Sequence, residues 1–131
     1  MIGLDTNVIV RYLTHDDPAQ TAAAVKLLDS LLPDEPGFLS LVVIVELVWV
    51  LESFYRAKKN EVTQVLETLL SNDRLVVERS EIVWLALRKF TGGRADFADC
   101  LIERSGHGAE CQYTATFDRK AATGAGMRLI S

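Results

Sequence analysis

Short apolar segments that alternate with longer helical patterns constrain the fold of this chain most strongly. Apolar segments this short are typical of buried strands, and apolar positions three or four residues apart are typical of helices. Strands that alternate with helices favour a parallel sheet with helices on both faces, which is an α/β fold. We expect strands at residues 2–4, 38–39, 75–77, 113–116 and 127–130, and helices at residues 8–13, 18–32, 41–55, 60–70, 81–90, 96–105 and 118–122.

Capping residues support the predicted ends of several helices. Asp17 and Pro18 together are typical of a helix start, with Asp at the N-cap and Pro at the first helical position. Ser40 and Ser80 are predicted N-caps for the helices that follow them. Glycines are expected to end two later helices, at Gly92 and Gly93 and at Gly106 and Gly108.

The size and composition indicate one compact domain over residues 1–131. Hydrophobic residues make up 49% of the 131, which is enough for a core without disulfide or metal support. There are 14 basic and 18 acidic residues, for a formal net charge of -4. That balance argues against a nucleic-acid binder. The objection weakens if several acids share one metal pocket, because bound cations would cancel part of their charge.

Cysteine usage and hydropathy favour a cytoplasmic protein with no membrane span. Cys100 and Cys111 have no metal-ligand spacing, and we expect two reduced, largely buried thiols. No basic segment of a signal peptide precedes Asp5. The longest apolar stretch, residues 38–51, is interrupted by Glu46 and is shorter than the roughly 20 residues that a membrane helix needs.

Two acids follow predicted strands. Asp5 comes directly after residues 2–4, and Asp118 follows the strand at 113–116. In a parallel α/β fold, the ligand site lies beyond the carboxyl ends of the strands. Both acids are therefore candidate ligands of Mg²⁺ or Mn²⁺, which prefer carboxylate oxygen. Each could instead be a turn residue or a helix N-cap.

Glu46 is the most informative acid, since ten of the eleven residues from Leu41 to Leu51 are apolar. A helix that is apolar on nearly all sides is expected to be buried. A lone buried carboxylate costs several kcal/mol unless it is paired or binds a metal. A salt bridge is the alternative, but no basic residue lies within helical reach, which favours a ligand role.

A third group of acids lies on one face of the helix at 96–105. Asp96, Asp99 and Glu103 are spaced by three and four residues, so their charges repel and need a cation or open solvent. We rank Asp99 first as a ligand, Asp96 second and Glu103 third. Asp96 also suits a cap role near the helix start.

Several other side chains are predicted to lie in the core, at an interface, at the surface or near the site. Trp49 and Trp84 are predicted to lie in the core or in a dimer interface, and His15 and His107 at the surface. Thr116, at a strand end, could hold a water or a ligand. The candidate contacts with substrate phosphate are Arg11, Arg94, Arg119 and Lys120.

Taken together, these segments resemble the PIN-domain family, and within it the VapC-type toxins of prokaryotic toxin–antitoxin pairs. The order and spacing of the matching pieces fit over essentially the whole chain. These pieces are residues 2–7, 46–47, 95–102 and 114–119. The resemblance implies that the catalytic metal ligands are Asp5, Glu46, Asp99 and Asp118, with Asp96 as a frequent additional acid. Thr6, Asn7 and Thr116 match the polar residues that support such a site.

The resemblance also implies a fold and a function. The fold would be a three-layer α/β/α sandwich with a central parallel sheet. The function would be that of an endoribonuclease toxin of a type II toxin–antitoxin system, hydrolysing RNA by water activated on Mg²⁺ or Mn²⁺. Its partners would be an RNA substrate, a small antitoxin protein and a second copy in a homodimer.

Two rival functions remain open from the sequence. A domain of the same fold could use its acids to bind only a structural ion or a partner, without catalysis. An aspartate-based phosphotransfer enzyme is less favoured, because a haloacid-dehalogenase-like phosphatase would need a second Asp where this chain has Asn7.

Overall fold

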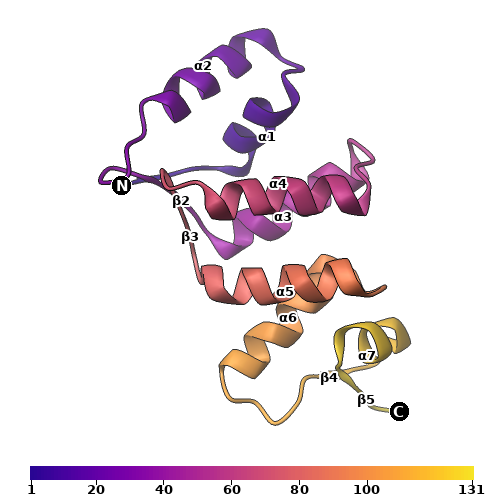
Figure 1. Cartoon of the computed structure of the whole chain (residues 1–131). Helices are drawn as coiled ribbons and strands as arrows, with labels where there is room; N and C mark the ends of the chain where they lie inside the picture. Colours follow the sequence, from indigo (N-terminus) through magenta and orange to yellow (C-terminus); the bar gives the residue numbers. More distant parts are fainter. The chain divides into compact units, whose positions relative to one another are not determined.

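The computed structural model describes residues 1–131 and contains two compact units, Met1–Glu78 and Arg79–Ser131. Seven helices and five strands are distributed between them (Figure 1). Every pairing between two named strands is parallel, as the alternation of strands and helices predicts. The prediction of a single domain over the whole chain stays a prediction.

The first unit contains a three-stranded sheet in the order β1-β2-β3, with four helices. Helices α1 and α2 pack together, and α3 lies alongside α4 (Figure 1). The core is formed by fully buried aliphatic side chains such as Ile9, Leu39, Ile44 and Leu66. The elements are β1 (Ile2–Gly3), α1 (Thr6–Thr14), α2 (Pro18–Asp29), β2 (Gly37–Leu39), α3 (Leu41–Ser53), α4 (Lys59–Ser71) and β3 (Leu75–Val77).

Polar side chains satisfy the first backbone N–H groups of α2 and α3. The Asp17 carboxylate accepts a hydrogen bond from the N–H of Gln20 at 3.1 Å, which confirms the predicted cap. Ser40 Oγ accepts from Val43 at 3.2 Å. Glu78, directly after β3, accepts from the N–H of Leu41 at 2.9 Å. The start of α3 is therefore held at the carboxyl ends of β2 and β3.

The predicted burial of the first strand is only partly right. Ile2 is 50% exposed and Gly3 is exposed, while the next residue, Leu4, is buried. β1 lies at an edge of its sheet and pairs only with β2.

The second unit consists of three helices and one pair of strands. Helices α5 and α6 pack closely, and Phe90 and Phe97 meet edge to face with ring centroids 5.9 Å apart. Val83, Phe97 and Cys100 are fully buried in this core. The elements are α5 (Ser80–Gly92), α6 (Phe97–Gly108), β4 (Ala115–Thr116), α7 (Arg119–Ala125) and β5 (Arg128–Leu129).

Two helix boundaries in the second unit differ from the prediction. Ser80 is the first residue of α5 and not its cap; the cap is Arg79, in the left-handed region at φ 50°. Helix α6 continues through Gly106 to Gly108. These glycines make room for neighbours, since a Cβ would lie 2.6 Å from Thr114 Oγ1 at Gly106 and 2.9 Å from Ile82 Cδ1 at Gly108.

Cys100 is buried, as expected, and Cys111 is exposed. The predicted burial of Cys111 is wrong, because it lies in the exposed turn after α6. None of the helices combines the length and the apolar content that crossing a membrane requires.

Candidate metal site

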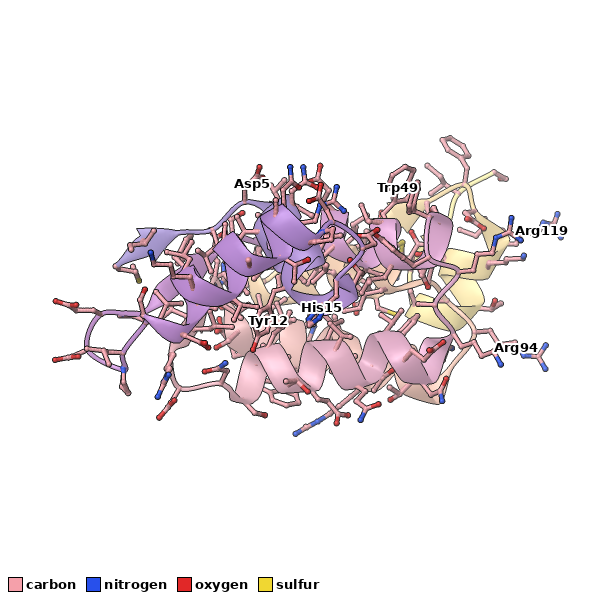
Figure 2. The ribbon with its side chains drawn as sticks, turned by 90° about the horizontal axis from the view of Figure 1, so that it is seen from above. Asp5, Tyr12, His15, Trp49, Arg94 and Arg119 are labelled. Carbon is pink, nitrogen blue, oxygen red and sulfur yellow. The ribbon has the colours of Figure 1, made fainter.

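Asp5 lies between β1 and α1 and is the N-cap of that helix. Its backbone is extended, with φ -77° and ψ 157°, and its Oδ1 accepts a hydrogen bond from the N–H of Thr6 at 2.8 Å. The cap interpretation is therefore confirmed. The bond uses one oxygen, so Oδ2 stays available to a cation. Asp5 is exposed and projects outward from the ribbon (Figure 2).

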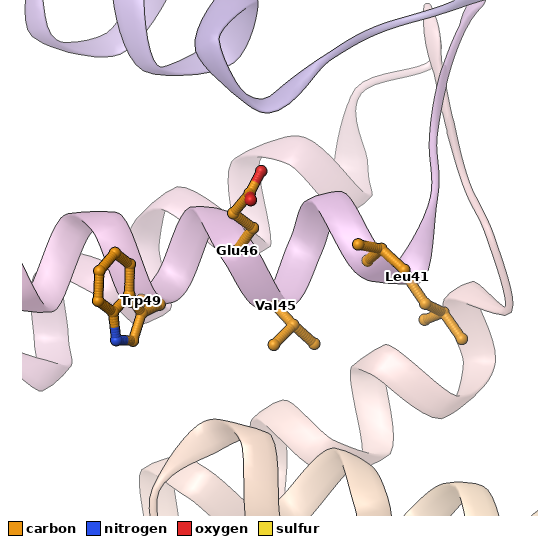
Figure 3. A pocket seen from close by; sticks show the side chains of 5 residues that line it. Leu41, Val45, Glu46 and Trp49 are labelled. Carbon is orange, nitrogen blue, oxygen red and sulfur yellow. The ribbon is translucent and has the colours of Figure 1, made fainter.

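Glu46 meets the start of α1 through Thr6. The Thr6 hydroxyl donates a hydrogen bond to Glu46 Oε1, although the two residues are 40 positions apart. Thr6 is 3% exposed, so packing holds its hydroxyl in place. The Glu46 carboxylate points away from Val45 and Leu41 on α3 (Figure 3). Thr6 thus links Asp5 and Glu46, although Thr6 is the cap of neither α1 nor α3.

The predicted burial of Glu46 is wrong, because Glu46 lies on an exposed side of α3. Its partner is a hydroxyl and not a basic side chain. The same helix leaves Val42 74% and Trp49 65% exposed, so Trp49 does not lie in the core, and its alternative place in a dimer interface stays a prediction. A hollow of about 520 Å³ lies along this side, lined by Leu41, Val42, Val45, Glu46 and Trp49.

Three acids lie near one another in the second unit. Asp96 is the N-cap of α6 and accepts from the N–H of Asp99 at 2.9 Å. Partial burial raises the pKa of Asp99 above its usual value, and the neighbouring charges of Asp96 and Asp118 raise it further. The part of the rise that comes from Asp96 and Asp118 is one that a bound cation would relieve.

Asp118 is held at the end of β4 by its own backbone and side-chain bonds. Its N–H donates to Thr116 Oγ1 at 3.0 Å, and its Oδ1 accepts from the N–H of Lys120 at 2.8 Å. As at Asp5, the cap interpretation is confirmed and a second carboxylate oxygen remains. Thr116 thus supports an acid, as the resemblance implies, and does so through the backbone.

Glu103 does not serve as a third ligand on α6. It is 9% exposed, and it accepts hydrogen bonds from Lys89 at 2.8 Å and from Arg104 at 2.6 and 3.0 Å. The hydrogen bond from Arg104, helped by the bond from Lys89 and by both positive charges, lowers its pKa to about 2 against the opposing effect of burial. The sequence could indicate Arg104, which is adjacent, but it contains no signal for Lys89, which is 14 positions away.

The donor chemistry of both groups suits a hard divalent cation. Carboxylate and hydroxyl oxygens are the ligands that Mg²⁺ and Mn²⁺ prefer. No group of three or more acidic, histidine or cysteine side chains in the structure is arranged to hold a metal ion by itself. Each unit therefore carries a part of the predicted ligand set, Asp5 and Glu46 in the first and Asp99, Asp118 and Asp96 in the second.

Arg11 differs from the other predicted phosphate contacts. It forms an ion pair with Asp16 at 2.9 Å and donates to Gln20 at 2.6 Å. A phosphate would have to displace one of these partners. Arg11 and the exposed Asn7 line a groove between α1 and α2. The other basic candidates, Arg94, Arg119 and Lys120, are exposed. Of these, Arg94 and Arg119 extend outward from the ribbon (Figure 2).

Comparison with known proteins identifies a family. A family model described as PIN domain matches residues 2–125. A curated relative from Aquifex aeolicus, named VapC ribonuclease, is 26% identical over 98 residues, which are 75% of this chain and 73% of the relative. Together with the parallel strand pairings, the family match confirms the predicted fold class, the α/β/α sandwich with a parallel sheet.

Proposed function

Because the chain belongs to the PIN-domain family, we propose that it is a divalent-metal-dependent endoribonuclease and the toxin of a type II toxin–antitoxin pair. The observation that supports this most directly is the electrostatics of the second unit. Asp99 has a raised pKa beside Asp96 and Asp118, as expected of carboxylates gathered for a cation. The similarity to a relative named VapC ribonuclease supports RNA as the substrate.

The proposed ligands are Asp5, Glu46, Asp99 and Asp118, with Asp96 as an auxiliary acid. A bound Mg²⁺ or Mn²⁺ would lower the pKa of a coordinated water and offset charge on the phosphate oxygens. Hydrogen bonds to Asp5 and Asp118 fix one carboxylate oxygen of each and leave the other for the ion. Thr6 fixes the orientation of Glu46.

The basic residues would complete the site by holding the substrate. Arg94, Arg119 and Lys120 are exposed, so each can reach a phosphate without breaking an ion pair. Water is the nucleophile in this scheme, so the chemistry does not require the 2′-hydroxyl of RNA. We propose a small antitoxin, a homodimer and a cytoplasmic location from the family, and surplus apolar surface such as Val42 and Trp49 is compatible with partners.

Cleavage of a mixed panel of structured RNAs by the purified protein tests this proposal. We expect cleavage that requires Mg²⁺ or Mn²⁺, stops with EDTA and is lost in Asp5→Asn. Asn caps a helix as well as Asp does, so this variant removes the charge and keeps the fold. Asp29→Asn, at the exposed end of α2, is the matched control and should retain activity.

Two results would contradict the proposal. Cleavage that survives EDTA and Asp5→Asn would show that the activity does not use this site. A folded protein that binds Mn²⁺ but cleaves no RNA in the panel would favour the non-enzymatic domain considered above.

A further inference from the structure

Lys89 joins three helices of the second unit. It lies in the last turn of α5. Its Nζ donates to Glu103 Oε1 on α6 at 2.8 Å and to the backbone oxygen of Ala125, the last residue of α7, at 2.7 Å. The side chain is 28% exposed, so the ammonium is partly removed from water and held by these two acceptors. One cation therefore links α5, α6 and α7.

Both partners of Lys89 lie on elements that carry predicted ligands. Glu103 is one helical turn after Asp99 on α6, so the two share a face. Ala125 ends the short helix that Asp118 caps. A shift of α7 relative to α6 would change the separation of Asp99 and Asp118, and the bonds of Lys89 oppose such a shift.

A glycine makes room for this contact. Gly126 follows α7 in the left-handed region, with φ 79°, and a Cβ built there would lie 3.1 Å from Lys89 Nζ. A side chain at this position would be strained and would crowd the ammonium. The absence of a side chain at Gly126 thus lets the carbonyl of Ala125 accept a hydrogen bond from Lys89.

A second close contact joins α7 to the residues just before α6. A Cβ at Gly124 on α7 would lie 2.9 Å from both the backbone nitrogen and the Cβ of Ala95. Ala95 is 2% exposed and directly precedes Asp96, the cap of α6. The absence of a side chain at Gly124 therefore lets α7 approach the start of α6, where the acids lie.

Stability alone is a weak explanation for this ionic cluster. Glu103 is paired with Lys89 and Arg104 at a side-chain exposure of 12%. Apolar side chains often stabilise such a location as well as an ion pair does, because burying charge removes its hydration. Directional bonds from one ammonium to two elements instead define a single spacing between those elements.

We propose that Lys89 is a positioning residue that sets the spacing of Asp99 and Asp118 for one divalent ion, by bridging Glu103 on α6 to the carbonyl of Ala125 on α7. This inference rests on the proposed function, since it needs the two aspartates to bind a metal. Lys89 does not contact either aspartate, and its effect on their affinity for the metal would be indirect.

Titration of the full chain with Mn²⁺, followed by calorimetry and by the electron paramagnetic resonance of the ion, tests the inference. Lys89→Met removes both bonds and keeps an unbranched apolar chain. Gly124→Ala displaces α7 from Ala95 by a separate route. Loss of a positioning interaction typically weakens metal binding by roughly 10-fold or more, so we expect about a 10-fold loss in each variant. Val83→Ala, in the core face of the same α5, is the matched control for destabilisation alone.

The outcomes are distinguishable. Weaker Mn²⁺ binding in Lys89→Met and Gly124→Ala, with unchanged binding in Val83→Ala at a temperature where all are folded, supports the inference. Wild-type affinity in folded Lys89→Met and Gly124→Ala would overturn the inference and leave the proposed function standing. Equal losses in all three variants would reduce Lys89 to a stabilising residue and overturn it also. No Mn²⁺ binding by the wild-type chain would overturn both.

Discussion

Thr6 is the residue that ties the first pair of acids together. Its backbone N–H donates to the Asp5 carboxylate and its hydroxyl donates to Glu46, so one buried residue orients two of the proposed ligands. A donor that fixes a ligand carboxylate contributes to metal affinity without touching the metal.

We predict that Thr6→Val weakens Mn²⁺ binding by roughly 10-fold. Valine fills the same volume but has no hydroxyl, so Glu46 loses its donor while the packing around α1 is kept. The accompanying loss in the free energy of unfolding should be about 1 kcal/mol. Calorimetric titration with Mn²⁺ and urea unfolding measure the two effects.

Thr6→Ser is the control, because it retains the hydroxyl and should retain most of the affinity. Unchanged Mn²⁺ affinity in folded Thr6→Val would show that the bond to Glu46 has no part in metal binding.

Single residues were predictable to the extent that local rules govern them. Asp5, Asp96 and Asp118 had two interpretations each, cap or ligand, and the structure confirms the cap while leaving an oxygen free at Asp5 and Asp118. For Glu46 the expected burial was wrong, because a nearly all-apolar helix need not be covered on every side. The hydroxyl that meets Glu46 is 40 positions away, and no local pattern indicates it.

Among the elements, α5, α6 and α7 depend on the ionisation of Glu103. Arg104 and Lys89 hold its pKa at about 2, below the ordinary value of 4.5. A carboxyl whose pKa is lower in the folded state stabilises the fold when it is ionised. That contribution is fully present above the ordinary value of 4.5 and is lost as the pH falls toward 2.

We predict that Glu103→Gln removes part of the acid sensitivity of the protein. The free energy of unfolding of the wild type should fall between pH 4.5 and about 2, and the variant should show a smaller fall over this range. At neutral pH the variant should be less stable by roughly 1–3 kcal/mol, since its amide replaces a charged acceptor. Urea unfolding at a series of pH values measures both.

Glu81→Gln is a matched control, because Glu81 is an exposed carboxylate paired with Arg79 in the same unit. If the free energies of unfolding of the wild type and of Glu103→Gln changed in parallel from pH 5 to pH 2, Lys89 and Arg104 would not stabilise the ionised form of Glu103.

Helix and strand identities followed from periodicity and capping, while some boundaries did not. Asp17 and Ser40 mark helix starts by accepting bonds from nearby N–H groups, and Pro18 does so by its place at the first helical position, which short patterns capture. Both Gly106 and Gly108 are expected to end α6, yet Gly106 lies within the helix and only Gly108 is at its end, and Thr114 and Ile82 approach these two glycines closely. A glycine that ends a helix and one that admits a neighbour look the same in a sequence.

For the whole molecule, the family could be predicted, its ligand set stays a prediction, and the long-range supports could not be predicted. Four short segments around Asp5, Glu46, Asp99 and Asp118 were enough to indicate the PIN-domain family, which the match over residues 2–125 confirms. The bridge from Lys89 to Glu103 and Ala125 joins positions 14 and 36 residues away, and it depends on packing that composition does not encode.

Asp99 and Asp118 of the second unit are proposed to bind one divalent ion. Mn²⁺ titration of the wild type, Asp99→Asn, Asp118→Asn and the double variant tests this most directly, because each Asn keeps the size of the side chain and removes one charged ligand. If one ion is shared, either substitution releases it and the second adds little. We predict strong binding by the wild type, a large loss in each single variant and no substantial further loss in the double variant. Binding that survives Asp99→Asn while Asp118→Asn abolishes it, or a wild-type chain that binds no Mn²⁺, would contradict this proposal.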